Sequence, residues 1–95
     1  MKAIWQGRVV AESEQTVEVG GYVYFPRQAV RMELLRAAAK TVSDNACPHG
    51  VHFYDLLDAG AFSERAAWSY EAPRASMEKI DHWIGFWGDV EIKDA

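Results

Sequence analysis

Glycine-containing turns divide this chain into short segments and limit it to short secondary-structure elements. Gln6-Gly7, Gly20-Gly21, Asp58-Ala59-Gly60 and Gly88-Asp89 each separate segments in which aromatic and aliphatic residues are frequent. Glycine reaches positive φ without a steric cost, so such turns favour tight hairpins. The spacing therefore predicts a series of short antiparallel strands.

The stability of the fold must come from its core, because Cys47 is the single cysteine and no internal disulfide can form. The 95 residues are enough for one domain, which we assign to residues 1–95. A chain of this size buries only about 60–65% of its unfolded surface. Hydrophobic residues make up 49% of the chain, with four tryptophans, four tyrosines and four phenylalanines, and large aromatic side chains suit such a small core.

The formal net charge of −4 argues against two classes of partner. Sequence-independent binding of nucleic acid depends on lysine and arginine, which neutralise phosphates, and anionic membranes attract polybasic segments. The first 11 residues lack the apolar run of a secretory signal, and no segment approaches the roughly 20 apolar residues of a membrane span. We therefore expect a cytoplasmic protein with neither a nucleic-acid partner nor a membrane partner.

Short apolar segments in the first quarter of the chain predict four strands, at residues 3–5, 8–11, 16–19 and 22–25. Pro26 ends this series because it cannot donate a hydrogen bond to a sheet. The next segment, residues 28–40, carries apolar residues at helical spacing and predicts a helix. Residues 41–50 are rich in turn-forming residues and predict a loop.

The second half of the chain predicts strands at residues 51–57 and 66–70. Ser76 is the expected cap of a short helix, from which Met77, Ile80 and Ile84 pack inward. A final strand pair is expected on either side of the Gly88-Asp89 turn. Together these elements predict a mainly β (α+β) fold, in which compact coiled antiparallel sheets form a small barrel-like domain with two short helices.

Several short strings follow one another in the order of a known family: Ala11-Glu12-Ser13, Tyr24-Phe25-Pro26, Cys47-Pro48, Ala67-Trp68-Ser69-Tyr70 with Pro73, and residues 80–86. Over about residues 2–92 they resemble the domain of unknown function 427. This family consists of small, mostly bacterial proteins that are sometimes labelled as nucleotidyltransferases. The resemblance implies a compact, coiled antiparallel β fold with little helix, and it implies no function.

The central loop departs from the pattern of that family, in which a cysteine and a proline precede an aromatic residue, a lysine and a glycine. This chain has the shorter sequence Cys47-Pro48-His49-Gly50, without the lysine, so an anion-holding role for that lysine is not expected here. The nucleotidyltransferase label also finds little support in the residues. Asp55 and Asp58 lie three apart on a predicted strand and are expected to point to opposite faces, and the chain has no G-x-x-x-x-G-K phosphate loop.

The segment from Cys47 to Tyr54 holds a thiol, two imidazoles and a phenol within eight residues. In one interpretation Cys47 is a catalytic nucleophile, and His49 or His52 is its general base. In another, the same three residues bind zinc, with His82 or a carboxylate as the fourth ligand. The spacing C-x-H-x-x-H matches no common zinc pattern, so we predict neither a metal site nor another cofactor.

Seven aromatic side chains could line a ligand pocket: Tyr24, Phe25, Tyr54, Trp68, Tyr70, Phe86 and Trp87. Most of them must belong to the core in a domain this small. Tyr54, Trp68 and Tyr70 are the strongest candidates for pocket walls, because tyrosine and tryptophan carry a polar group that requires a partner. Tyr24 and Glu12 complete the predicted ligand-binding residues.

Three functions are compatible with these residues. The favoured one is a small-ligand-binding module, because binding requires fewer coincidences of geometry than catalysis. Its aromatic-walled pocket would lie beside the Cys47–Gly50 loop and accept a small polar or nucleotide-like ligand. The alternatives are an enzyme that uses Cys47 as a nucleophile, and a homodimer or structural protein whose aromatic residues form an interface.

Overall fold

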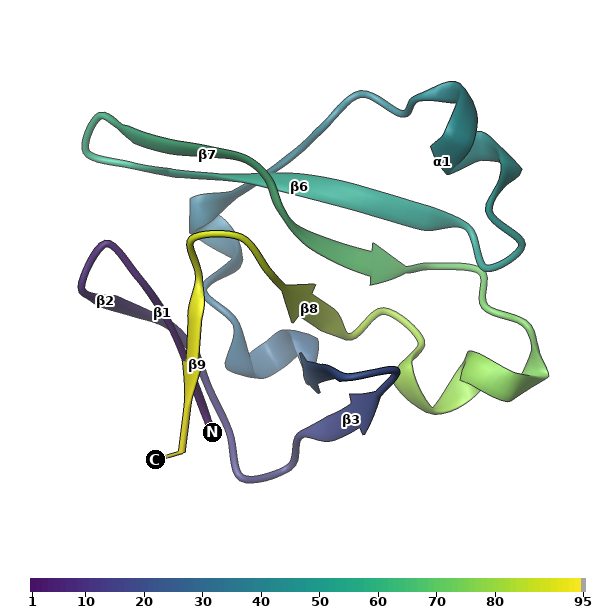
Figure 1. Ribbon diagram of the computed structural model, residues 1–95, viewed down its shortest axis with the longest axis horizontal. Helices are drawn as coiled ribbons and strands as arrows, with labels where there is room; N and C mark the ends of the chain where they lie inside the picture. The colour runs from purple at the N-terminus through teal and green to yellow at the C-terminus, as the bar shows by residue number, and fades with distance from the viewer. Residues whose placement is uncertain (95) are drawn as a thin grey trace.

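Two antiparallel sheets make up the computed structural model, which describes residues 1–94 (Figure 1). The smaller sheet has the order β2-β1-β9 and consists of β1 (Lys2–Trp5), β2 (Arg8–Glu12) and β9 (Glu91–Lys93). The larger sheet has the order β3-β4-β8-β7-β6-β5, with bounds β3 (Val17–Val19), β4 (Tyr22–Phe25), β5 (Leu35–Ala37), β6 (Val51–Asp58), β7 (Ala61–Tyr70) and β8 (Ile84–Phe86). The mainly β prediction is confirmed, and within residues 1–94 the two sheets do not close into a barrel.

The three predicted hairpins form as the turn signals indicated. Trp5 faces Arg8 across the first turn, Val19 faces Tyr22 across the second, and Asp58 faces Ala61 across the third. Both central residues of each turn have positive φ, from 48° at Ala59 to 88° at Gly60. This is the backbone of a type I′ turn, whose twist matches that of the strands it joins.

The helix predicted over residues 28–40 is wrong. The segment instead forms two 3-10 turns, η1 (Arg27–Ala29) and η2 (Met32–Leu34), followed by β5. Its backbone is used in sheet contacts: Arg31 N–H donates to Val10 O over 2.8 Å, and Leu35 pairs with Leu56 of β6. An isolated helix of this length is marginal, so pairing with β6 outweighs the local helical preference.

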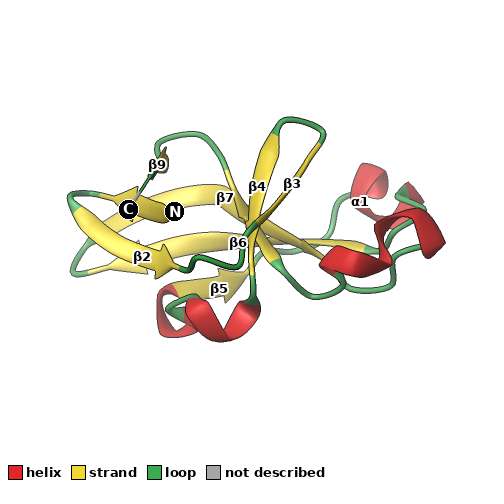
Figure 2. Cartoon of the chain, turned by 90° about the horizontal axis from the view of Figure 1, so that it is seen from below, coloured by secondary structure: helices red, strands yellow, loops and turns green. Residues whose placement is uncertain are grey.

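The predicted loop at residues 41–50 contains one short helix, α1 (Val42–Ala46). A capping box starts it. The Asp44 N–H donates to Thr41 Oγ1 over 3.1 Å, and Asp44 Oδ2 accepts from the Thr41 N–H over 3.0 Å. The Thr-x-x-Asp spacing is the sequence signal for this start. Figures 1 and 2 both place α1 at the opposite end of the β6–β7 hairpin from the three-stranded sheet.

Two predictions near the C-terminus need correction. The helical segment η3 (Ala75–Ile80) has Arg74 rather than Ser76 at its cap position, without a side-chain cap bond. Ile80 packs inward as expected. The strands around Gly88-Asp89 do not pair with each other, because β8 lies between β4 and β7 while β9 pairs with β1. The turn thus carries the chain from the larger sheet to the smaller one, where Lys93 of β9 pairs with Lys2 of β1 (Figure 1).

Side chains from both sheets form the main core, whose largest members are Trp5, Phe25, Leu56, Ile84 and Phe86. The Trp5 Nε1–H donates to Ser63 Oγ over 2.9 Å and so links β1 of the small sheet to β7 of the large one. A second buried cluster contains Tyr24, Val51, Trp68 and Ile80. It supports the site described next. Among the described residues, no helix combines the length and apolar character that crossing a membrane requires.

Candidate ligand-binding site

An open hollow of about 150 Å³ lies on one face of the six-stranded sheet and is lined almost entirely by aromatic rings. The lining residues are Tyr22 of β4, Val51 and Phe53 of β6, Trp68 and Tyr70 of β7, and Trp87 just after β8. Three strands, together with the residue that follows β8, therefore contribute to one small surface. We call this group of residues the aromatic hollow.

Strand register explains why these residues share a face. Val51 lies opposite Tyr70 and Phe53 lies opposite Trp68 in the β6–β7 ladder. Successive side chains of a strand alternate between faces, so residues at i and i+2 on each strand emerge together. The result is a block of four side chains, next to which Tyr22 of β4 and Trp87 after β8 both lie on the β7 side.

Trp68 is the floor of the hollow, and Tyr22 and Trp87 stand at its rim. The Trp68 side chain is only 5% exposed, whereas Tyr22 and Trp87 are 41% and 45% exposed. The Tyr22 ring lies 5.0 Å from the Trp68 ring at 87°, and the Trp87 ring lies 5.6 Å from it at 70°. Both rim rings therefore meet the floor at steep angles, which gives the surface its concave shape.

Both indole N–H groups of the hollow are bound within the protein. The Trp68 Nε1–H donates to Tyr24 Oη over 3.3 Å, and the Trp87 Nε1–H donates to the Arg65 carbonyl over 2.6 Å. Burial raises the pKa of Tyr24 to about 12, despite the opposing hydrogen bond from Trp68. Tyr24 therefore stays neutral at physiological pH, and the two tryptophans offer a ligand only their ring surfaces.

Gly85 of β8 makes room for the floor. A Cβ atom at this position would lie 2.8 Å and 2.9 Å from two atoms of the Trp68 ring and 3.1 Å from the Tyr24 ring. Gly85 pairs with both of these residues, one on each neighbouring strand. Glycine inside a strand often marks such a close approach, and here it allows the indole to lie flat against the sheet.

Arg65 connects the hollow to α1. Its guanidinium lies 4.0 Å from the centre of the Phe53 ring and donates to both carboxylate oxygens of Asp44, over 2.8 Å and 3.0 Å. These hydrogen bonds, together with the Thr41 N–H, hold the pKa of Asp44 at about 2. The Arg65 backbone has a φ of 53° at a bulge, where its N–H donates to Asp55 Oδ1 over 2.9 Å. The cation beside the hollow is therefore neutralised by a fixed partner.

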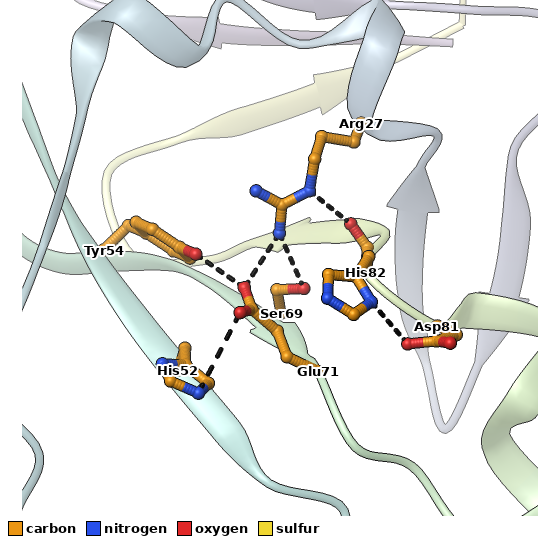
Figure 3. A network of polar contacts seen from close by, with 7 residues as sticks. All are labelled: Arg27, His52, Tyr54, Ser69, Glu71, Asp81 and His82. Carbon is orange, nitrogen blue, oxygen red and sulfur yellow. Dashed lines mark hydrogen bonds and ion pairs between the residues drawn. The ribbon is translucent and has the colours of Figure 1, made fainter.

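A polar network occupies the opposite face of β6 and β7 (Figure 3). Glu71 Oε2 accepts from the Tyr54 hydroxyl over 2.6 Å and from Arg27 Nη2 over 2.8 Å. Arg27 also donates to Ser69 Oγ over 3.2 Å and to the His82 carbonyl over 2.9 Å. The network joins the chain after β4 to the ends of β6 and β7 and to the turn after η3. Because these groups are paired with one another, we assign the network a structural role.

Protonation within this network follows from its contacts. Burial alone would raise the pKa of Glu71, but the Tyr54 hydroxyl and the charges of His52 and Arg27 outweigh it and lower that pKa below its usual value. Burial, followed by the bond to Glu71, raises the pKa of Tyr54. Glu71 is therefore a carboxylate at neutral pH and Tyr54 is a hydrogen-bond donor to it.

The structure divides the predicted ligand-binding residues among three places. Trp68 and Tyr70 line the hollow, and Tyr24 lies buried beneath it. Tyr54 points away from the hollow into the polar network (Figure 3). Glu12 is exposed at the end of β2, in the other sheet.

The predicted catalytic residues each contact a different partner. Among the described residues, Cys47 makes no hydrogen bond to His49 or His52; it packs against the cluster beneath the hollow. His49 Nδ1 accepts from the Arg74 N–H over 3.0 Å, and the His49 ring contacts Tyr70. His52 faces Glu71 at 3.9 Å. Within residues 1–94, no three His, Cys, Asp or Glu side chains are placed to hold a metal ion.

Sequence reasoning missed two ring residues of the hollow, Tyr22 and Phe53, and Trp87 was not among its preferred candidates. The available signal was strand alternation. Phe53 shares a face with Val51, and a ladder that places Phe53 opposite Trp68 excludes Tyr54 from that face. The register of the β6–β7 ladder is set by the turn at residues 58–60 and by the bulge at Arg65. The sequence pattern does not predict that bulge.

These features define a small two-sheet antiparallel β domain with a ring-lined hollow on its larger sheet. The comparison with family models gives the more particular assignment. The chain belongs to the family described as a domain of unknown function (DUF427), whose model matches residues 1–94. This confirms the resemblance seen in the sequence. A search of curated proteins gave no significant match.

Proposed function

We propose that this protein is a small-ligand-binding module whose site is the aromatic hollow. The observation that carries the proposal is a concave, solvent-open surface lined by five aromatic side chains and Val51. Exposed aromatic carbon is unfavourable in water, and its concentration at one hollow is typical of a recognition surface. The Cys47–Gly50 loop borders this surface through the contact between His49 and Tyr70.

The size of the hollow limits what can enter it. About 150 Å³ is well below the roughly 300–1,000 Å³ of pockets that enclose drug-sized ligands, and it matches the cavities that accept one benzene molecule. We therefore expect the hollow to hold one compact group of a ligand, such as a single ring or a small branched group. The rest of that ligand would lie over the rim.

Isothermal titration calorimetry with compact probes, phenol and choline, tests this proposal. The proposal predicts saturable binding of at least one probe at millimolar concentration. Replacing Trp87 by leucine should weaken that binding, because the variant loses a rim ring but keeps apolar bulk. Phe62→Leu is the matched control, because Phe62 is 51% exposed and lies outside the hollow. If neither phenol nor choline binds saturably, the proposal is refuted.

The same exposed rim favours one competing outcome, a homodimer in which Tyr22 and Trp87 are buried. Analytical ultracentrifugation over a hundredfold range of concentration distinguishes the two. The ligand proposal predicts a monomer with a free rim. A dimer that dissociates in the Trp87→Leu variant would show that the hollow is an assembly interface and would contradict the ligand proposal.

A further inference from the structure

We propose that the group bound in the aromatic hollow is a methylated ammonium, such as the trimethylammonium head of choline. The inference rests on the proposed function and adds the chemical class of the ligand. Quaternary ammonium groups bind where several aromatic faces surround a small space, because each ring attracts the cation through its quadrupole. The ring angles, the hydrogen bonding and the charges around the hollow favour this class over a neutral planar ring.

The ring angles suit a compact, roughly spherical group. Tyr22 and Trp87 meet the Trp68 floor at 87° and 70°, while Phe53 is tilted by 43° to Trp68 and by 34° to Trp87. A planar ligand could stack on only one of these surfaces. A tetrahedral ammonium can contact several of them at once, and a hollow of about 150 Å³ admits one such compact group.

Hydrogen bonding points to the same class. A nucleobase is normally recognised by stacking together with hydrogen bonds to its edges. The two indole N–H groups of the hollow are already bound, to Tyr24 Oη and to the Arg65 carbonyl, so the hydroxyls of Tyr22 and Tyr70 are the polar side-chain groups left among the lining residues. A quaternary ammonium has no N–H and requires no acceptor, so a surface made of ring faces is sufficient for it.

The charges around the hollow permit a cation. The Phe53 ring already makes a contact with a cation, because the Arg65 guanidinium lies 4.0 Å from the centre of that ring. The two hydrogen bonds from Arg65 to Asp44 neutralise that charge, so it repels a second cation only weakly. The chain as a whole carries a formal net charge of −4, which favours a cationic ligand over an anionic one.

Calorimetric comparison of choline with 3,3-dimethylbutan-1-ol tests the inference, because the alcohol has the same shape without the charge. We expect choline to bind more tightly than the alcohol by roughly two- to thirtyfold, the range set by cation–π attraction. Equal affinities, or binding of phenol without binding of choline, would overturn the ammonium assignment and leave the proposed ligand site intact. Failure of both choline and phenol to bind would overturn the ammonium assignment and the ligand site together.

Variants separate ring attraction from simple burial. Trp87→Leu and Tyr22→Leu should each reduce choline affinity while changing the affinity for the alcohol much less. Trp87→Phe, which restores a ring, should recover part of the choline affinity. Phe62→Leu should leave both affinities unchanged, and thermal melts should show that each variant is folded. Equal losses of choline and alcohol in the leucine variants would contradict the ammonium assignment.

Discussion

Replacing Gly85 by alanine tests whether close packing under Trp68 builds the floor of the hollow. At most sites where the backbone φ is negative, exchanging glycine for alanine stabilises a protein by about 0.4–1 kcal/mol, because the unfolded chain loses entropy. Gly85 lies outside the positive-φ region, yet its new methyl carbon would sit 2.8–2.9 Å from the Trp68 ring. Trp68 and Tyr24 are 5% and 2% exposed, so neither ring can move aside freely.

The expected result is therefore a loss of stability. Overpacking a filled core costs about 1–3 kcal/mol, and each kcal/mol lowers Tm by about 4–8 °C in a domain of this size. We expect Gly85→Ala to lower Tm by roughly 5–20 °C in a calorimetric melt. The near-ultraviolet circular dichroism of the tryptophans should change as well, because the floor ring is displaced.

A double-mutant cycle with Trp68→Phe identifies the cause. The smaller ring removes the atoms that the new methyl group would meet, so the two substitutions together should cost less than the sum of their separate costs. Coupling between touching residues is typically about 0.5–3 kcal/mol. An unchanged or higher Tm for Gly85→Ala, or strict additivity in the cycle, would refute the close packing described here.

The remaining predictions concern the core and two titrating groups. Leu56→Ala, at a fully buried site, should lower the unfolding free energy by about 2–5 kcal/mol. Leu57→Ala, at a site that is 38% exposed, should change it by less than about 1 kcal/mol. Equal losses of unfolding free energy in urea titrations would contradict the assignment of these two residues to opposite faces of β6. The pKa of Asp44 is about 2 in the folded chain and about 4 in an unfolded one. The ionised carboxylate therefore contributes fully to the stability of the fold above about pH 4, and this contribution is lost as pH falls from about 4 to about 2. The Tm of Asp44→Asn should therefore fall less than the Tm of the native chain between about pH 4 and pH 2. Identical dependence of Tm on pH in the two proteins would show that the hydrogen bonds to Asp44 do not lower its pKa. The pKa of Tyr24 is about 12 in the folded chain and about 10 in an unfolded one, so the stability of the fold should fall as pH rises between these values. The stability of Tyr24→Phe should fall less steeply over the same interval. Equal slopes for the two proteins would count against burial of the phenol.

The hairpins could be predicted from the sequence because their signals are local. Gln6-Gly7 and Gly20-Gly21 can adopt the positive φ of a type I′ turn, and neighbouring residues supply the strands. The same logic failed where distant pairing decides the outcome. Residues 28–40 have helical spacing, but the exposed edge of β6 takes up Leu35–Ala37 as a strand.

The candidate site was only partly predictable because its composition depends on register. Trp68 and Tyr70 line the hollow, as their pattern suggests, whereas Phe53 lies there and the predicted Tyr54 does not. A shift of one residue moves a side chain to the other face of a sheet, and the bulge at Arg65 that sets this register is stabilised by Asp55, ten residues away in sequence. Tyr22 and Trp87 join the hollow through strands β4 and β8, whose pairing the sequence pattern did not reveal.

The most direct test of the central claim is an NMR titration that follows the four indole N–H resonances during addition of choline. Trp68 and Trp87 line the hollow, whereas Trp5 lies in the main core and bonds to Ser63. A ligand site at the hollow predicts saturable shifts at Trp68 and Trp87 with none at Trp5. Shifts that follow choline without saturating, or that centre on Trp5 and leave Trp68 and Trp87 unmoved, would contradict it.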